Sequence, residues 1–188
     1  MFYRYYQTSK ITKWIPISDD KTVVERALAS SAIKLSILAV SEDVTDATPI
    51  TSLAYKGHMY FDIDCKEDIP AAIESTKHLV RKLKEMGVPD TYMQVFCSGS
   101  KGMHPMVHSH AFSSSRAVRM LPWIYGAMAD SLSEFGMDFQ VYSAKKGNCW
   151  RLPNLKREDG KYRVPVTMEE LESLTMEDYA AFVSEPRL

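Results

Sequence analysis

The sequence has few of the features that mark secreted, membrane-spanning or zinc-dependent proteins. It contains three cysteines, Cys65, Cys97 and Cys149, and none of them forms a CxxC pair. This argues against a zinc ribbon and against a disulfide framework. No stretch approaches the ~20 apolar residues of a membrane span, and the first residues lack the layout of a signal peptide. We therefore expect free thiols and a cytoplasmic protein.

An excess of charge of one sign is also missing, because the formal net charge is −1. The distribution is more informative than the total. Residues 138–163 carry seven Lys or Arg against three acids, whereas residues 164–188 carry six acids and one Arg. A basic segment of local charge +4 before an acidic tail of −5 predicts a local anion site. For Lys145 and Lys146 a solvated hairpin tip is an equally good explanation.

The chain of 188 residues shows no internal repeat and no low-complexity tract, so we expect one domain, which could have two closely packed lobes. Hydrophobic alternation and turn residues predict an α/β (α+β) fold with antiparallel strand pairs and helices on one face. The expected strands are Phe2–Tyr6 at a sheet edge, Ile33–Val40, Thr51–Lys56 and His58–Asp64 as a hairpin at Gly57, Tyr92–Cys97, Met103–Val107, Phe139–Tyr142, Cys149–Leu152 and Tyr162–Val166.

Four helices are expected from capping residues and helical spacing. They are a short one at about 21–30 after Asp19 or Asp20, a long one capped by Asp68, a second long one from 113–115 to about Phe135 with a kink at Pro122, and a tail helix after the capping box Thr167-Met168-Glu169-Glu170.

Asp62 and Asp64 lie two residues apart on an expected strand, so their side chains should face the same side, about 7 Å apart. Two such carboxylates repel each other unless a cation lies between them. Mg²⁺ and Mn²⁺ prefer oxygen ligands and keep waters or substrate phosphates in their other positions. The pair is therefore a candidate metal site, although many such pairs are solvated strand ends.

A glycine-rich turn, Ser98-Gly99-Ser100-Lys101-Gly102, follows the expected strand that ends at Cys97. Glycines allow backbone N–H groups to converge on an anion, while hydroxyls and a lysine add donors and charge. The GxxxxGK[ST] spacing of a Walker A loop is absent. His104 follows the turn, where it would either donate to a phosphate or pack within the sheet.

Asp138 is a third carboxylate, at an expected helix-to-strand junction thirteen residues before Arg151. The intervals of 34 residues from Asp64 to Ser98 and from His104 to Asp138 are alike. In this order the segments resemble the three motifs of the archaeo-eukaryotic primase superfamily, and within it the primase-polymerases of phages, plasmids and other mobile elements. The segments are Phe61-Asp62-Ile63-Asp64, Cys97-Ser98-Gly99-Ser100-Lys101-Gly102-Met103-His104, and Asp138 ahead of Arg151-Leu152-Pro153-Asn154.

The resemblance implies an RRM-like mixed or antiparallel sheet flanked by helices and packed against a smaller N-terminal α/β unit. The corresponding lobes are residues 1–50, 51–166 and 167–188. The chain would be either a catalytic domain cut from a longer replication protein or a minimal polymerase. The implied reaction is template-directed nucleotidyl transfer by a DNA primase or DNA polymerase. The implied partners are a single-stranded DNA template, a primer strand, a dNTP or NTP, and a replicative helicase domain or protein.

The same resemblance implies roles for individual residues. Asp62, Asp64 and Asp138 would hold two divalent ions, Mg²⁺ or Mn²⁺. Ser98, Ser100, Lys101 and His104 would grip the triphosphate, and Arg151 with Lys156 or Arg157 would add charge to that grip.

Two other readings remain open. A rolling-circle endonuclease uses paired histidines, and His108-Ser109-His110 offers such a pair, although the serine between them weakens the match. A non-catalytic RRM-like module would stack bases on aromatic residues such as Tyr60, Phe61, Tyr92 and Phe96. Three carboxylates would repel phosphate in such a module, and this favours catalysis.

Overall fold

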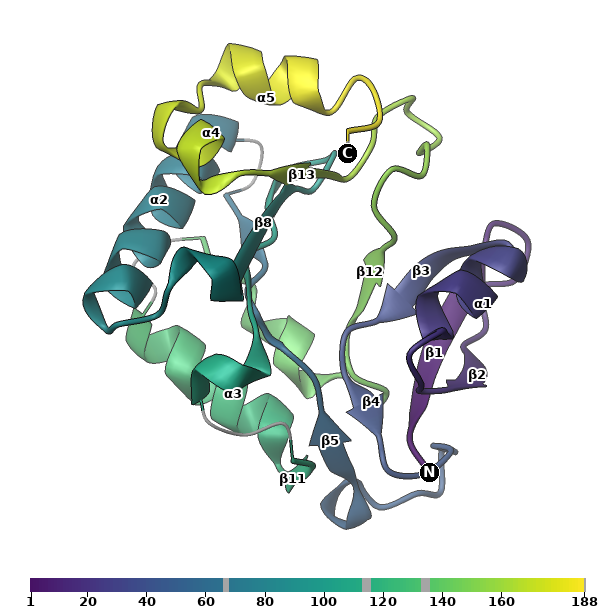
Figure 1. The fold of residues 1–188 in the computed structure, drawn as a ribbon. Coiled ribbons are helices and arrows are strands. Elements are labelled where there is room, and N and C mark those ends of the chain that lie inside the picture. Colours follow the sequence, from purple (N-terminus) through teal and green to yellow (C-terminus); the bar gives the residue numbers. More distant parts are fainter. Residues whose placement is uncertain (66–67, 113–115, 133–135, 188) are drawn as a thin grey trace.

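The structure is a computed structural model that describes residues 1–65, 68–112, 116–132 and 136–187. Two antiparallel sheets form its centre, with most of the helices on the outer side of the second sheet (Figure 1). This arrangement confirms the predicted α+β class with antiparallel strand pairs. All three cysteines are free thiols, as expected. In the described ranges, no helix combines the length and the apolar character needed to cross a membrane.

The first sheet has the strand order β11-β5-β4-β1-β3-β12, and β2 pairs with β1. Its strands come from distant parts of the chain, so a lobe boundary at residue 50 does not separate the two sheets. Within the described chain the strands are Tyr3–Thr8 (β1), Ile15–Ser18 (β2), Ala32–Ser36 (β3), Ala39–Val40 (β4), Ala54–Lys56 (β5), Val118–Arg119 (β11) and Cys149–Arg151 (β12).

The second sheet has the order β6-β10-β8-β9-β7, and β13 pairs with β8. It carries both the Asp62 segment and the glycine-rich turn, which lie far apart in the sequence. Its strands are Met59–Tyr60 (β6), Ile63–Asp64 (β7), Met93–Cys97 (β8), Gly102–Met103 (β9), Met106–Val107 (β10) and Val164–Val166 (β13).

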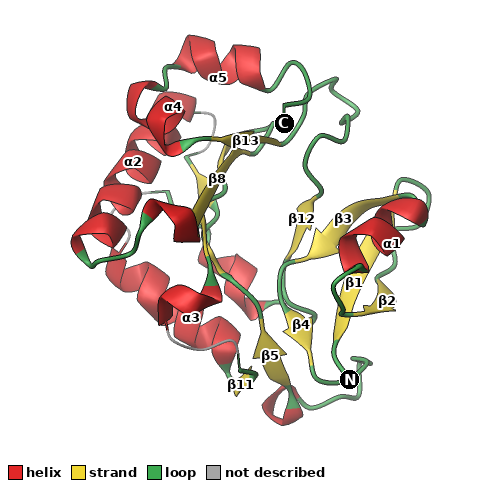
Figure 2. Cartoon of the chain, in the orientation of Figure 1, coloured by secondary structure: helices red, strands yellow, loops and turns green. Residues whose placement is uncertain are grey.

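Helices cover the outer side of each sheet, with α1 on the first and the longer helices on the second (Figure 2). Asp68 caps α2 as predicted, because its carboxylate accepts a hydrogen bond from the N–H of Ala71 at 2.9 Å. The α-helices are Val23–Ala29 (α1), Ile69–Glu85 (α2), Leu121–Leu132 (α3), Met168–Ser173 (α4) and Met176–Phe182 (α5). Short 3₁₀ helices lie at Ile50–Ser52 (η1), Asp90–Tyr92 (η2), Ser109–Phe112 (η3) and Phe139–Ser143 (η4).

Two strand predictions near the N-terminus are wrong in detail. The segment predicted as an edge strand is β1, which lies inside its sheet because Tyr3–Tyr6 pair with β2 and Tyr6–Thr8 pair with β3. The strand predicted at Ile33–Val40 breaks into β3 and β4. The buried Ser36 hydroxyl accepts the Tyr5 N–H and donates to the Leu38 carbonyl, so a side chain replaces the regular ladder there.

The predicted hairpin at Gly57 is also wrong, because β5 belongs to the first sheet and β6 and β7 to the second. Gly57 has a φ of +147°, and a Cβ there would lie 2.8 Å from a methyl of Leu38. The glycine therefore serves a close crossing between sheets. Its position in the sequence is equally typical of a hairpin turn.

Two later elements differ as well. The strand predicted at Met103–Val107 is divided into β9 and β10 by His104 and Pro105, since proline has no N–H for a ladder. The strand predicted at Phe139–Tyr142 is the 3₁₀ helix η4, which Asp138 caps through the N–H of Gln140. The segment Lys145–Asn148 is consequently no hairpin tip between two strands.

The helix predictions need two corrections. α3 begins at Leu121, so Pro122 lies in its first turn, where proline is tolerated, and causes no kink. The cap expected at residues 113–115 and the end expected near Phe135 lie outside the described residues. α1 follows Thr22, and the carboxylate of Asp20 accepts the Thr22 N–H in a turn before the helix.

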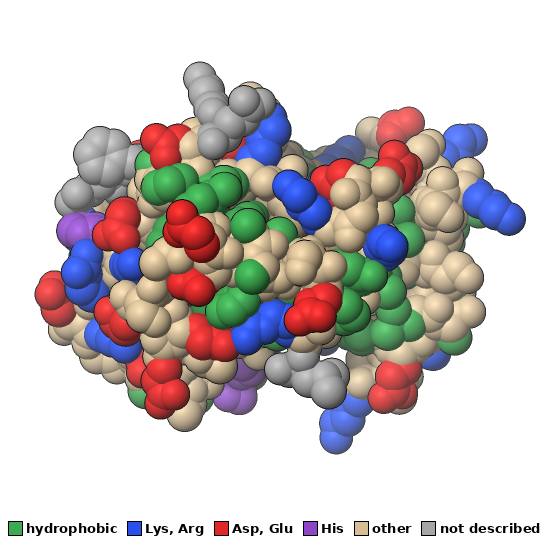
Figure 3. Space-filling view, turned by 90° about the horizontal axis from the view of Figure 1, so that it is seen from above, with side chains coloured by type: hydrophobic (Ala, Val, Ile, Leu, Met, Phe, Trp, Pro, Cys, Tyr) green, Lys and Arg blue, Asp and Glu red, His purple; other side chains and the backbone are tan. Residues whose placement is uncertain are grey.

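The acidic tail forms two helices, α4 and α5. The capping box predicted at Thr167 is present at the start of α4, and a second box at Thr175 starts α5. Figure 3, which views the molecule from the side of these helices, shows acidic and basic side chains interspersed on this face. A mixed surface of this kind agrees with the near-zero net charge.

Tyr60 joins the two sheets just before the Asp62 segment. Its side chain is fully buried and lies 5.1 Å from the ring of Tyr142 and 5.7 Å from that of Trp150, centroid to centroid. Its hydroxyl donates to the Val141 carbonyl at 3.2 Å, and the Tyr142 hydroxyl donates to the Tyr60 carbonyl. A strand of the second sheet is thereby fixed against β12 of the first, which sets the separation of the walls described next.

Candidate active site

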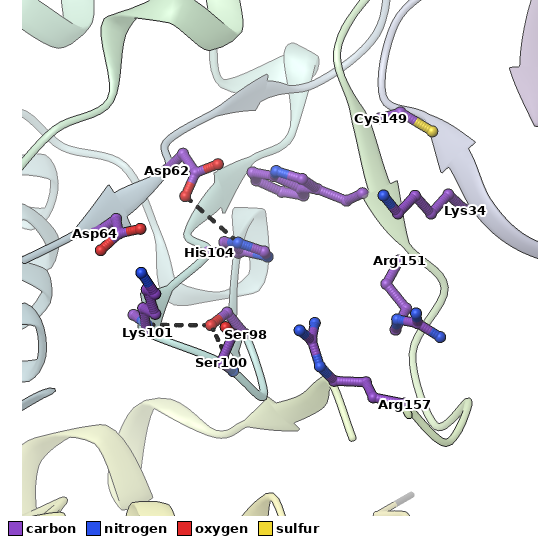
Figure 4. A pocket seen from close by; sticks show the side chains of 12 residues that line it. Lys34, Asp62, Asp64, Ser98, Ser100, Lys101, His104, Cys149, Arg151 and Arg157 are labelled. Atoms are coloured by element: carbon purple, nitrogen blue, oxygen red, sulfur yellow. Dashed lines mark hydrogen bonds and ion pairs between the residues drawn. The ribbon is translucent and has the colours of Figure 1, made fainter. Parts of the chain in front are cut away.

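A cavity of about 230 Å³ lies between the two sheets. The second sheet contributes two carboxylates and the glycine-rich turn, and the first sheet contributes cationic side chains (Figure 4). The lining residues are Lys34, Asp62, Asp64, Ser98, Ser100, Lys101, Gly102, His104, Cys149, Trp150, Arg151 and Arg157. Seven of the nine predicted site residues are thus in one place, and Asp138 and Lys156 are the other two.

The carboxylate wall, Asp62 and Asp64, results from strand alternation. Phe61 and Ile63 point into the core with 0% and 1% exposure, so the two aspartates point the other way, into the cavity. Ile63 pairs with Met103 of β9, and the Asp64 N–H donates to the Gly136 carbonyl at 2.8 Å. Pairing on both edges fixes the backbone under both carboxylates.

Asp138 lies beside this wall but does not line the cavity. Its N–H donates to the Asp62 carbonyl at 2.9 Å, next to a bridge between Ile63 and Met137. Its carboxylate accepts the N–H of Gln140 at 2.9 Å and caps η4. In the part of the chain that the structure describes, no three His, Cys, Asp or Glu side chains are grouped closely enough to hold a metal ion.

A divalent cation is nevertheless compatible with Asp62 and Asp64 alone. Magnesium is usually bound through one or two carboxylates, with waters and substrate phosphates in the remaining positions. The two carboxylates line the same cavity as the phosphate-binding candidates, so metal ligands and a triphosphate would meet there. Asp138 accepts the Gln140 N–H through Oδ1, so its second oxygen, Oδ2, could coordinate a cation while that hydrogen bond is kept.

The turn after β8 requires glycine at two positions. Gly99 has a φ of +74°, and a Cβ on it would lie 2.3 Å from the Tyr162 carbonyl oxygen. A Cβ on Gly102 would lie 1.8 Å from the Ile63 carbonyl oxygen, between the two aspartates of the carboxylate wall. Since both distances are far below van der Waals contact, Gly102 allows the turn to lie directly against that wall, and Gly99 allows it to lie against the backbone of Tyr162.

The Ser98 hydroxyl organises this turn from within. It accepts the N–H groups of Ser100 and Gly102, each at 3.1 Å. The hydroxyl of Tyr179 on α5 donates to the Gly102 carbonyl at 3.1 Å. These two amides were expected to point at an anion, and they instead donate to Ser98. These two amides are thus not available to a ligand, whereas the exposed Lys101 offers its side chain.

His104 is placed between the two walls. Its Nε2 lies 3.5 Å from Asp62 Oδ1, and its ring stacks on Trp150 with centroids 4.3 Å apart and planes within 5°. Its Nδ1 accepts a hydrogen bond from the Nε–H of Arg163 at 3.2 Å. Burial lowers the pKa of His104, while the nearby Asp62 carboxylate acts in the opposite direction.

The cationic wall consists of Lys34, Arg151 and Arg157. Lys34 on β3 pairs in register with Arg151 on β12, so both side chains leave the first sheet at one place. Arg151 donates to the Lys156 carbonyl at 3.3 Å. The Lys156 side chain is exposed and is not among the residues that line the cavity. Arg157 lines the cavity in its place and lies 3.4 Å from Asp159. Lys145 also lies elsewhere, donating to the carbonyls of Thr45 and Asp46.

Sequence reasoning missed Lys34, Cys149, Trp150 and Arg163. Two of them, Cys149 and Trp150, directly precede Arg151, so the strand pattern there offered a signal that was not used. Lys34 reaches the cavity through the pairing of β3 with β12, which nothing local in the sequence reveals. Arg163 was counted only as one charge of the basic segment.

The two alternative readings find little support in the geometry. His108 and His110 form a cluster with His58, with ring centroids of neighbours 4.3–4.5 Å apart, away from the residues that line the cavity. Tyr60 and Phe61 have no exposed surface and cannot stack on a base. Phe96 is covered by the guanidinium of Arg163, 3.8 Å from the ring centroid.

Comparison of the sequence with protein-family models and with curated proteins gives no match. Comparison of the fold does. The chain is similar to the polymerase domain of Mycobacterium tuberculosis ligase D, solved in complex with DNA, with a TM-score of 0.54 and 15% identity. The match covers 95% of this chain and 69% of that domain. The likeness is one of fold, and it extends over almost the whole chain.

Proposed function

We propose that this protein catalyses template-directed nucleotidyl transfer, as a DNA polymerase or DNA primase. The observation that carries the proposal is one cavity with two strand-mounted carboxylates on one side, a Ser/Lys/His turn beside them and arginines opposite. The fold shared with a polymerase domain solved with DNA adds support. A protein that only bound nucleic acid would gain nothing from carboxylates at this point, because they repel phosphate.

In the proposed reaction a primer 3′-hydroxyl attacks the α-phosphate of a dNTP or NTP. A bond forms from O3′ to the α-phosphorus, the bond from the α-phosphorus to the bridging oxygen of the β-phosphate breaks, pyrophosphate leaves, and the hydroxyl proton passes to solvent water. Asp62, Asp64 and Asp138 would hold two Mg²⁺ or Mn²⁺ ions. Such ions, when bound, lower the pKa of the attacking hydroxyl and neutralise charge on the leaving oxygen.

The remaining residues bind and orient the triphosphate. Lys101 and Ser100 approach it from the turn that Ser98 holds in shape, and His104 donates from the centre of the cavity. Arg151 and Arg157 supply charge from the opposite wall, where planar guanidinium groups match phosphate oxygens. Most of the rate enhancement would come from positioning and from charge neutralisation.

The direct test is extension of a labelled primer on a single-stranded DNA template with dNTPs and Mg²⁺ or Mn²⁺. Asp62→Asn and Asp64→Asn should each lower kcat by about 10³-fold or more, because each removes a charge that holds metal. Asp130→Asn on α3 is a matched control, because Asp130 is exposed and is not among the residues that line the cavity, and it should extend normally. Normal extension by both cavity variants, with folding verified by circular dichroism, would refute the proposal.

Two variants of Asp138 can distinguish a residue that only caps η4 from a third metal ligand. Asparagine keeps an oxygen that can accept the Gln140 N–H, whereas alanine does not. If Asp138 only caps η4, Asp138→Asn should be active and Asp138→Ala impaired. If it is the third metal ligand, as proposed, both variants should be inactive in primer extension.

Priming is tested by omitting the primer and supplying ATP or dATP with the template. Products that begin from two nucleotides would show primase activity, and extension alone would show a polymerase. A role in phage or mobile-element replication, with a helicase as partner, belongs to this proposal and predicts activity on a helicase-opened duplex.

A further inference from the structure

Arg163 lies behind the cavity and contacts residues of both walls. Its Nε–H donates to His104 Nδ1 at 3.2 Å, on the second sheet. Its Nη1 donates to the Arg151 carbonyl at 3.1 Å, at the end of β12 in the first sheet. One guanidinium therefore holds a candidate phosphate donor from each wall. Arg163 itself immediately precedes β13, which pairs with β8 beside the glycine-rich turn.

The Arg163 side chain is held in a closed environment. It is 5% exposed, and its guanidinium carbon lies 3.8 Å from the ring centroid of Phe96 and 5.0 Å from that of Trp150. Its second terminal nitrogen, Nη2, is buried and has no hydrogen-bond partner among the described residues. Burial lowers the pKa of Arg163 to about 9, so the group remains charged at neutral pH. A buried cation with an unsatisfied N–H is costly, and packing alone does not explain its presence.

The contact with Arg163 determines which imidazole nitrogen of His104 carries the proton. A guanidinium has N–H donors and no acceptor, so a nitrogen that it contacts must present a lone pair. Nδ1 of His104 is that nitrogen. The ring proton is then on Nε2, which lies on the side of Asp62 and the cavity.

We propose that Arg163 is a positioning residue that fixes His104 as a neutral Nε2–H donor facing Asp62 and the cavity, where the triphosphate would bind. Trp150 supports the same ring by stacking on its face. The grip of His104 on phosphate is then a directed hydrogen bond, and positive charge comes from Lys101 and the arginines. The triphosphate as ligand rests on the proposed function, whereas the tautomer and its dependence on Arg163 do not.

The first test is ¹⁵N NMR of the histidine side chains in the whole protein, with the His104 signals assigned from a His104→Asn variant. The expected result for the wild type at neutral pH is a bare Nδ1 and a protonated Nε2. A wild-type ring protonated at Nδ1 would overturn the proposal without any further variant.

The second test compares Arg163→Met and Arg163→Lys. Methionine keeps much of the apolar stem but has no donor, so the ring should shift toward the Nδ1–H tautomer. Lysine keeps a charged donor and should largely preserve the wild-type signals. If Arg163→Met folds and His104 keeps its tautomer, the positioning role is wrong. If Arg163→Met fails to fold, the wild-type spectrum of the first test still decides, because a ring protonated at Nδ1 overturns the proposal.

The third test measures nucleotide use. Arg163→Met should raise the KM for dNTP about tenfold with a smaller change in kcat, and it should add little in a His104→Ala background, since both changes remove the same interaction. Fully additive effects would contradict action through His104. If no variant and no wild type extends a primer while the tautomer behaves as expected, the proposed function fails and the positioning of His104 stands.

Discussion

The two walls of the cavity are built on different principles. Asp62 and Asp64 leave a short strand whose backbone is paired on both edges and whose intervening residue is buried. Lys34, Arg151 and Arg157 are long side chains that reach the cavity from the outer end of the first sheet and from a loop. One wall is fixed by its backbone, and the other is adjustable through side-chain rotamers.

This difference suits a site that must hold small ions at fixed positions and must also hold a flexible triphosphate, which can adopt several positions. Metal ligands tolerate little displacement, whereas phosphate oxygens can be met by any nearby guanidinium. Trp150, His104 and Arg163 lie where the walls meet and connect them. Substitutions on each wall can test whether changes to the carboxylate wall and to the cationic wall have different effects on activity and stability.

The largest effect is expected from Gly102→Ala. A Cβ at this position would lie 1.8 Å from the Ile63 carbonyl, so the strand between the two aspartates must move. We expect a loss of more than about 100-fold in extension and a fall in Tm of at least about 5 °C, as for a few kcal/mol in a domain of this size. Thermal melting and primer extension measure both.

Gly160→Ala is the matched control for this change. Gly160 has a φ of +84°, and a Cβ added there would meet no atom of another described residue within 4 Å beyond its chain neighbours, so only backbone strain of about 1–2 kcal/mol is added. Extension should remain close to wild type. Equal losses in the two variants would show that the carboxylate wall does not depend on close packing at Gly102.

On the cationic wall, Arg151→Gln should affect mainly nucleotide binding. A hydrogen bond to a charged group contributes about 1.5–3 kcal/mol, which corresponds to a rise of roughly 10- to 100-fold in the KM for dNTP. The kcat should change only a few-fold, because neighbouring cations remain. Arg81→Gln on the exposed side of α2 is the control, and a selective loss of kcat in Arg151→Gln would contradict the comparison.

The stability of the protein should depend on pH through His58, which lies where the chain passes from β5 of the first sheet to β6 of the second. Burial, with help from His108, lowers the pKa of His58 to about 4 from the usual 6.5. The unfolded chain therefore takes up this proton more readily, and stability should fall as the pH drops from about 6.5 to about 4.

His58→Asn tests this dependence. Its side-chain oxygen can replace Nδ1 as acceptor for the Ser109 N–H, which lies 3.3 Å away. Melting curves between pH 7 and pH 4 should be flatter for the variant than for the wild type. A parallel pH dependence in both proteins would exclude His58 as the titrating group.

The smallest effect is expected from Tyr179→Phe, which removes the hydroxyl that donates to the Gly102 carbonyl. The loss should be about 1 kcal/mol of stability, with at most a few-fold change in KM. This variant asks whether the acidic C-terminal helices support the glycine-rich turn. A variant with wild-type melting would show that α5 contributes nothing there through this contact.

The predictable parts of the molecule depend on local chemistry. Alternation placed Asp62 and Asp64 on one face, and side-chain caps identified the starts of α2 and α4. The errors concern choices between distant partners. Gly57 was expected to form a hairpin and instead carries the chain to another sheet, and Asp138 was expected to precede a strand and instead caps a 3₁₀ helix.

The candidate site shows the same division. Motif residues near Asp62 and Ser98 could be named from spacing, and they do line one cavity. Arg163 and Trp150 could not, since their positions depend on the pairing of β13 with β8 and of β12 with β3. A residue that connects the two walls has no local sequence signature, because its contacts are with residues far away in the sequence.

The stack of Trp150 on His104 also gives the molecule an optical property. Trp150 is 6% exposed and touches a ring of the opposite wall, whereas Trp123 is 36% exposed. Indole fluorescence depends on solvent access and on quenching by a neighbouring imidazole. Trp150 and Trp123 should therefore differ in emission maximum and in fluorescence lifetime. In a variant that carries both Trp14→Phe and Trp123→Phe, Trp150 is the remaining tryptophan, and changes in its emission would report any separation of the walls when a nucleotide enters, without an attached label.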